Sequence, residues 1–184
     1  TVEISKRDGS TQTLTTRSIV IATGAAPFVP PLPGLDEVGY LTSDTLWGLR
    51  ELPQRLLVLG GGPIGCELAQ SFARLGSQVT QIEMLPRLMI REDDEVSAFA
   101  RQALEADGVT VLTGHKALRC ENTAAGKFIV VECGGEHKHI GFDVLLCAVG
   151  RSARLKGFGL EELGIPVDRT VQTNELLQTI YPNI

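Results

Sequence analysis

The hydrophobic pattern of this chain is clearest in the middle of the sequence, where a strand, a helix and a second strand follow one another. Residues 56–59 are all apolar, which predicts a central parallel strand covered on both faces. Apolar residues then recur at helical spacing from Ile64 to Leu75, and Gly76 is a typical residue to end such a helix. Residues 79–82 predict the next strand.

A second helix is predicted to begin near Asp93. The residues Asp93, Asp94 and Glu95 place negative charge at its N-terminus, where the helix dipole stabilises it. We expect its buried stripe to consist of Val96, Phe99, Ala100, Ala103 and Leu104.

Two further parallel strands are predicted, separated by a region whose pattern is typical of short antiparallel strands. Residues 109–112 and 143–149 have the composition of buried parallel strands, and Gly150 closes the second of them. Between them, residues 116–121, 128–133 and 138–140 predict short antiparallel strands joined by turns that contain glycine.

The amino-terminal part has a different character. A hairpin is predicted from residues 2–5 and 11–15, and residues 18–23 predict a compact apolar strand closed by Gly24. Four prolines between residues 27 and 33 predict a surface linker, because proline lacks the amide donor that a helix or central strand needs. A short helix is expected from an N-cap at Thr42-Ser43 to about Leu49.

Composition and charge exclude several classes of function. The chain of 184 residues is 43% hydrophobic and 21% charged, and its net charge of −5 comes from interspersed acids and bases. No basic patch is present, so we expect no nucleic-acid partner. No apolar run reaches the roughly 18 residues of a membrane span. The four cysteines lack the spacing of metal or redox pairs, so we expect no metal site and a reducing, cytoplasmic location.

The sequence Gly60-x-Gly62-x-x-Gly65 lies between the first predicted strand and its helix. This is the context in which such a motif binds a dinucleotide. Gly60 allows the tight turn, Gly62 lets the backbone approach a pyrophosphate, and Gly65 lets the helix pack closely on the strand. The pyrophosphate would accept hydrogen bonds at the helix N-terminus.

Glu83 ends the following strand, 23 residues after Gly60. The acid that binds the ribose hydroxyls of NAD is expected about 20 residues after the motif. A carboxylate there repels a 2′-phosphate, so NADH is favoured over NADPH. Arg87 and Arg91 are expected to be solvated surface charges, although they could serve a phosphate.

Together these features resemble the class I pyridine nucleotide-disulfide oxidoreductases, with dihydrolipoamide dehydrogenase and mercuric reductase as the most similar members. The resemblance is carried by residues 18–27 with Pro30, Pro33 and Gly34, by residues 60–67, by residues 143–151 and by residues 173–184. The implied fold is a Rossmann-like, three-layer α/β NAD-binding domain with a parallel sheet and a small antiparallel β crossover. Pieces of a FAD domain flank it.

The resemblance implies a role for individual residues. Thr23, Gly24 and Ala25 would line the FAD site. Ala117 would border the adenine, and Gly150 would contact NAD through its backbone. NADPH-specific relatives carry arginine in place of Glu83 and of Met89, so both residues favour NAD. The remaining NAD contacts implied by the family are Gly60, Gly61, Gly62, Pro63, Ile64, Gly65, Cys66 and Glu67, the last lying near the nicotinamide and flavin.

We therefore expect the central portion of an FAD-dependent enzyme that passes hydride between NADH and flavin, coupled to a disulfide or metal-ion substrate. The expected divisions are a FAD-domain tail and linker (residues 1–34), the NAD domain (35–155) and a return segment (156–184). Both ends look excised, so the chain alone is expected to be inactive and to contain no catalytic residue. The redox cysteine pair and the domain that forms a homodimer would lie elsewhere in the enzyme. Two alternatives are a flavin NADH oxidase or ferredoxin reductase without the cysteine pair, and a non-catalytic NAD-sensing module.

Overall fold

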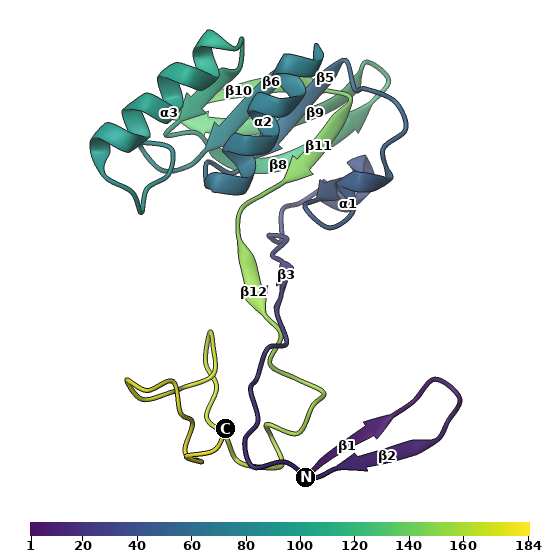
Figure 1. Cartoon of the computed structure of the whole chain (residues 1–184). Helices are drawn as coiled ribbons and strands as arrows, with labels where there is room; N and C mark the ends of the chain where they lie inside the picture. Colours follow the sequence, from purple (N-terminus) through teal and green to yellow (C-terminus); the bar gives the residue numbers. More distant parts are fainter. The chain divides into compact units, whose positions relative to one another are not determined.

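The computed structural model describes all 184 residues, which form two compact units. The larger unit is Pro27–Arg151, and the smaller unit combines Thr1–Ala26 with Ser152–Ile184. Figure 1 labels most of the helices and strands of the two units. None of the helices is long and apolar enough to cross a membrane.

A five-stranded parallel sheet lies at the centre of the larger unit (Figure 1). The four parallel strands predicted at residues 56–59, 79–82, 109–112 and 143–149 are all present. The edge strand β4 was not predicted. In spatial order the strands are β4 (Leu41–Thr42), β11 (Val144–Cys147), β5 (Arg55–Leu59), β6 (Gln78–Glu83) and β7 (Thr110–Thr113).

Two helices cover one face of this sheet, α2 (Pro63–Leu75) and α3 (Asp94–Ala106). Gly76 ends α2 in the left-handed conformation, as its position predicted. The core beneath the helices includes alternate strand residues such as Leu56, Val58 and Leu146, because successive side chains of a strand point to opposite faces.

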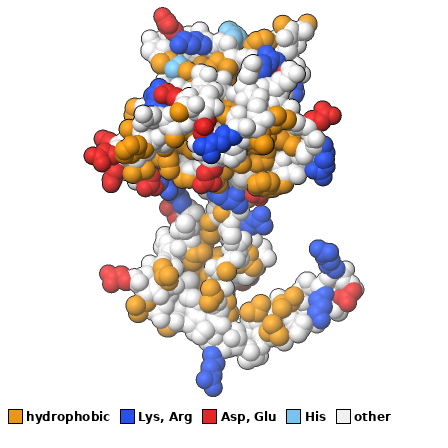
Figure 2. All heavy atoms as spheres, turned by 45° about the horizontal axis from the view of Figure 1, so that its top comes forward, with side chains coloured by type: hydrophobic (Ala, Val, Ile, Leu, Met, Phe, Trp, Pro, Cys, Tyr) orange, Lys and Arg blue, Asp and Glu red, His pale blue; other side chains and the backbone are white.

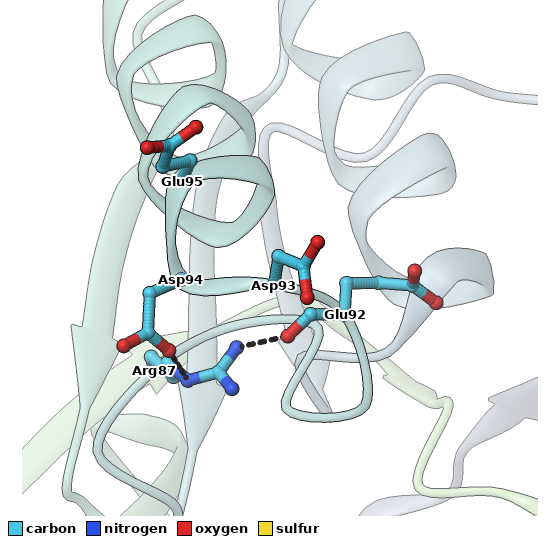
Figure 3. Close-up of a pocket in the computed structure, with 5 residues that line it drawn as sticks. All are labelled: Arg87, Glu92, Asp93, Asp94 and Glu95. Atoms are coloured by element: carbon cyan, nitrogen blue, oxygen red, sulfur yellow. Dashed lines mark hydrogen bonds and ion pairs between the residues drawn. The ribbon is translucent and has the colours of Figure 1, made fainter.

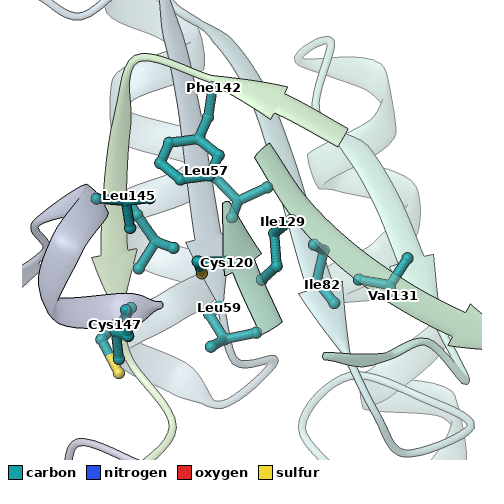
Figure 4. Packing of buried hydrophobic residues seen from close by; sticks show 11 residues of the cluster. Leu57, Leu59, Ile82, Cys120, Ile129, Val131, Phe142, Leu145 and Cys147 are labelled. Atoms are coloured by element: carbon teal, nitrogen blue, oxygen red, sulfur yellow. The ribbon is translucent and has the colours of Figure 1, made fainter. Parts of the chain in front are cut away.

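A small antiparallel sheet covers the other face, with the short helix α1 (Leu35–Val38). The strands of this antiparallel sheet, in spatial order, are β10 (Glu136–Phe142), β9 (Gly126–Cys133) and β8 (Lys116–Thr123). Side chains from both sheets interdigitate between them, including Leu57 and Ile82 from the parallel sheet and Ile129 from β9 (Figure 4). The larger unit is therefore the predicted three-layer, Rossmann-like α/β fold.

Helix α3 does not bury the stripe expected of it. Ser97 and Leu104 are buried, but Val96 is 44% exposed and Phe99 is 71% exposed. The Ser97 hydroxyl donates to the Leu88 carbonyl at 2.7 Å, and this bond holds the serine against the loop that follows β6. Ala103 is exposed as well. The prediction for Val96, Phe99 and Ala103 was wrong because helical spacing does not say which of two adjacent stripes faces the core. Hydrophobic side chains are visible at the surface of both units (Figure 2).

The segment before β5 also differs from its prediction. The expected helix is a single 3-10 turn, η1 (Leu46–Gly48), and Thr42 belongs to the edge strand β4. Thr45 is the N-cap of this turn but makes no side-chain cap bond; its hydroxyl instead accepts a hydrogen bond from the Thr42 amide at 2.9 Å.

The smaller unit contains the predicted hairpin, formed by β1 (Val2–Ser5) and β2 (Thr11–Leu14). Residues 18–23 form no strand, contrary to prediction. A strand needs the backbone of a neighbour along its length, and this segment makes one bond of that kind, from the Ile19 amide to the Asn183 carbonyl. The strands β3 (Ala25–Pro27) and β12 (Arg151–Ala153) pair with each other.

Candidate dinucleotide-binding site

The glycine-rich turn lies at the carboxyl end of β5 and leads into α2. Its first amide, that of Gly60, donates to the Ile82 carbonyl of the neighbouring strand β6 at 2.8 Å. Gly62 is the N-cap of α2 and Pro63 its first residue, and no side chain caps this helix end. The amides of the first turn therefore have neither an intrahelical acceptor nor a side-chain cap.

Two glycines of the turn are required by the packing of the protein itself. Gly60 has a φ of 118°, and a Cβ there would overlap the Ala148 carbonyl of the neighbouring segment. A Cβ on Gly65 would overlap the Gly60 carbonyl oxygen and lie 3.2 Å from the amide nitrogen of Gln81. These contacts give the tight turn and the close helix-to-strand packing that the sequence predicted.

Gly61 is also enclosed by protein. A Cβ there would lie 2.8 Å from Cδ2 of Leu88 and 2.9 Å from Cβ and Cγ of Glu83. Its carbonyl accepts a hydrogen bond from the Met89 amide at 2.7 Å. The middle of the turn is thus held between the end of β6 and the loop that follows it.

Gly62 differs from the other three glycines. Its φ of −78° and ψ of 177° suit any amino acid, and an added Cβ would meet no atom within 4 Å. Neither backbone geometry nor protein packing requires glycine here, and the Cα faces open space.

The Glu83 carboxylate closes the turn from the side of β6. One oxygen accepts a hydrogen bond from the Gly61 amide at 2.6 Å, and the other accepts from the Leu85 amide at 2.8 Å. A carboxylate oxygen has about two acceptor positions, so each oxygen keeps capacity for a further donor. The structure therefore brings together the glycine turn and the acid that the sequence paired with it.

Arg87 organises the loop that follows Glu83, and Figure 3 shows its contacts with Glu92 and Asp94. Its guanidinium donates to the carbonyls of Met89 at 3.3 Å, Ile90 at 3.1 Å and Glu92 at 2.9 Å. It also pairs with Asp94 at 3.0 Å. The prediction of a solvated surface charge was wrong for Arg87, because the side chain is only 30% exposed and most of its donors are bonded to the loop.

Other residues implied by the family resemblance lie in different surroundings. At the N-terminal end of α2, Cys66 is buried, whereas Glu67 is exposed. Gly150 follows β11 and has a φ of 139°, in the region that favours glycine. Ala117 is the second residue of β8, pairs with Val131 and packs against the core between the sheets.

The residues implied for FAD lie around the end of the smaller unit's first segment. The Thr23 hydroxyl donates to the Arg154 carbonyl at 2.8 Å. The Gly24 carbonyl accepts from the Arg154 amide at 3.0 Å, and Gly24 has a φ of 71°. No group of three or more histidine, cysteine or acidic side chains that could hold a metal ion is present in the chain.

Gln81 was not predicted from the sequence as a residue of this site. It is fully buried in β6, and its amide nitrogen donates to the Gly60 carbonyl at 3.0 Å and approaches the Cys66 sulfur at 3.5 Å. Burial raises the pKa of the Cys66 thiol, and the contact with Gln81 opposes that shift. A polar residue within a strand that is covered on both faces was the signal available.

The chain matches a known family over its whole length. Residues 1–184 match the family described as pyridine nucleotide-disulphide oxidoreductase. A mercuric reductase of Staphylococcus aureus is 39% identical over 170 residues, which cover 91% of this chain and 31% of that protein. A dihydrolipoyl dehydrogenase of Thermus scotoductus is 40% identical over 180 residues, which cover 94% of this chain and 38% of that enzyme.

Solved structures give the same result. The HOCl-induced flavoprotein disulfide reductase of Escherichia coli superposes with a TM-score of 0.80 at 29% identity, over 99% of this chain and 41% of that one. The chain thus spans well under half the length of these relatives. From the family match and these similarities, we conclude that the chain belongs to the class I pyridine nucleotide-disulfide oxidoreductase family.

Proposed function

We propose that this chain provides the NAD(H)-binding domain of an FAD-dependent oxidoreductase. The observation that carries the proposal is Gly62. Protein packing accounts for the glycines at positions 60, 61 and 65, but a side chain at position 62 would meet no protein atom within 4 Å. A glycine whose Cα faces open space at a helix N-terminus is what close approach of a pyrophosphate requires.

The rest of the turn suits the same ligand. The pyrophosphate would lie at the N-terminus of α2, where amides without intrahelical acceptors and the positive end of the helix dipole both attract an anion. The proposed NAD contacts are Gly60, Gly61, Gly62, Pro63, Ile64, Gly65, Cys66, Glu67, Glu83, Ala117 and Gly150.

Glu83 would select NADH over NADPH. Its two carboxylate oxygens already accept the Gly61 and Leu85 amides, and their remaining acceptor positions suit the two ribose hydroxyls. A 2′-phosphate in the same place would meet a negative charge. Arg87 would not compensate, because its guanidinium is bonded to three carbonyls and to Asp94.

For the intact enzyme we propose hydride exchange between NADH and flavin, coupled to a disulfide or metal-ion substrate. Residues 35–155 would form the NAD domain, and residues 1–34 and 156–184 would belong to the FAD domain, with Thr23, Gly24 and Ala25 at its cofactor. NADH supplies the hydride when bound, while the residues of this chain bind and orient it. The four cysteines form no disulfide, which favours the reducing cytoplasm. We propose that the enzyme is a homodimer, as implied for this family.

The test is a titration of the protein with NADH and with NADPH, followed by calorimetry or by NADH fluorescence. Wild-type protein is expected to bind NADH more tightly than NADPH. Glu83→Ala is expected to weaken NADH binding by about 1.5–3 kcal/mol, the range for hydrogen bonds to charged groups, and to narrow the preference between the two cofactors.

Glu105→Ala is the matched control, because it removes the same charge from an exposed ion pair on α3. We expect it to change neither affinity. Failure of the wild-type protein to bind NADH, or a preference that Glu83→Ala leaves unchanged, would contradict the proposed function.

A further inference from the structure

Gln81 is a polar residue whose register partners on both neighbouring strands are apolar. It pairs in register with Val58 of β5 and with Val111 of β7. By the alternation of β6 its side chain lies on the same face as Val79, which packs against the helices. The residue is fully buried, so water does not solvate its amide.

The amide of Gln81 is only partly satisfied. Its nitrogen donates to the Gly60 carbonyl at 3.0 Å, whereas its oxygen is buried without a hydrogen-bond partner. A buried polar atom without a partner lowers stability, and an apolar side chain of similar size avoids that loss. Stability therefore does not account for glutamine at this position.

The Gln81 nitrogen also approaches the Cys66 sulfur at 3.5 Å, but its shorter hydrogen bond, to the Gly60 carbonyl, acts on one peptide unit of the turn. The Gly60 carbonyl and the Gly61 amide belong to the same planar group, so fixing one orients the other. Gln81 bonds the carbonyl at 3.0 Å, and Glu83 accepts from the amide at 2.6 Å. Both residues lie in β6, two positions apart, so one strand holds this peptide at both ends.

We propose that Gln81 is a positioning residue of the dinucleotide site. By holding the Gly60 carbonyl, it fixes the plane of the Gly60–Gly61 peptide, and through the Gly61 amide it orients the Glu83 carboxylate. This inference rests on the proposed function, since it assigns Gln81 to the site where Glu83 meets the ribose.

The test replaces Gln81 with methionine, which has a similar length and volume but no amide; Gln81→Leu is the second variant if the first folds poorly. NADH affinity is expected to fall by about three- to tenfold, the decrease that corresponds to the net contribution of one neutral hydrogen bond. The thermal midpoint of the unliganded protein should not fall, because the unpaired oxygen is removed as well. The 15N amide resonance of Gly61 should shift, because its peptide unit loses a hydrogen bond.

Ser77→Ala is the matched control. Ser77 immediately precedes the same strand at its opposite end, and its buried hydroxyl donates to the Pro53 carbonyl at 2.6 Å. Its loss should lower the thermal midpoint and leave NADH affinity unchanged. A residue that serves only the fold would behave like Ser77.

A double-mutant cycle separates this inference from the proposed function. Because Gln81 acts through the peptide that Glu83 binds, Gln81→Met should weaken NADH binding by less than about twofold in the Glu83→Ala background. Unchanged affinity in the single variant, or an equal loss in both backgrounds, would overturn the role of Gln81 alone. Absence of NADH binding by wild-type protein, or no effect of Glu83→Ala, would instead overturn the proposed function.

Discussion

Gly65 and Gly62 belong to the same motif, yet the structure predicts opposite effects on stability when each is replaced by alanine. At Gly65 the added methyl group would overlap the Gly60 carbonyl oxygen and lie 3.2 Å from both the Gly60 carbonyl carbon and the Gln81 amide nitrogen. Helix α2 would have to move away from β5. At Gly62 the methyl group would meet no atom within 4 Å.

The two magnitudes follow from these contacts. Overpacking a close-packed site costs about 1–3 kcal/mol, and displacement of the Gly60 carbonyl would weaken its bond to Gln81 by a further 0.5–1.5 kcal/mol or so. Gly65→Ala should therefore lower the free energy of unfolding by about 2–4 kcal/mol. Alanine is a poorer N-cap than glycine, but it also restricts the unfolded chain, which offsets about 0.4–1 kcal/mol of that loss. Gly62→Ala should remain within about 1 kcal/mol of wild type.

The assay is urea denaturation followed by circular dichroism at 222 nm. All the helices lie in the larger unit, so this signal reports the unfolding of the unit that contains the turn. Two results would refute this reasoning: a Gly65→Ala protein as stable as wild type, or a Gly62→Ala protein destabilised as much as Gly65→Ala. The first would show that packing does not require glycine at position 65, and the second that position 62 does not face open space.

Two further predictions concern the electrostatics of the larger unit. The hydrogen bond from Arg55 lowers the pKa of Asp143 below the ordinary aspartate value of 3.8. The ionised carboxylate therefore stabilises the fold fully at pH values above 3.8, and this contribution is lost as the pH falls through the lowered pKa. Asp143→Asn should cost at most about 1 kcal/mol at pH 7, because the pair is partly exposed, and should flatten the fall in stability on the acid side; an unchanged pH profile would contradict the pairing. Three of the four cysteines are buried. Burial raises the pKa of the Cys120 thiol to about 11 and also raises the pKa values of Cys66 and Cys147. Cys133 is only half-buried. A thiol-specific disulfide reagent at pH 8 should therefore modify Cys133 first and the other three only on unfolding; rapid reaction of all four cysteines in the folded protein would contradict this burial.

The features that could be predicted from the sequence are those with local causes. Helix α2 begins at Pro63 and ends before Gly76 because both residues act through their own backbone preferences. The strands β5 and β11 were predictable because a strand covered on both faces is apolar throughout. The pairing of Glu83 with the turn followed from its spacing in the βαβ unit.

The features that were missed depend on contacts between distant residues. Phe99 is exposed because the Ser97–Leu88 bond sets the rotation of α3, and helical periodicity does not encode that bond. The residues 18–23 form no strand because strand formation depends on a neighbouring backbone. Gln81 looked like an ordinary strand residue, since its acceptors, the Gly60 carbonyl and the Cys66 sulfur, lie 21 and 15 positions away.

The affinity of Gly62→Ala for NADH tests the central claim most directly, because the substitution adds one methyl group in open space and leaves the fold intact. Dissociation constants of wild type and variant should be measured under the same conditions, with Gly62→Ala matched to wild type by circular dichroism. If the pyrophosphate approaches the backbone at Gly62, the variant should bind NADH at least about tenfold more weakly, since the methyl group would occupy the space of the ligand. Equal affinity in a variant of unchanged stability would contradict the claim that NADH binds at this turn.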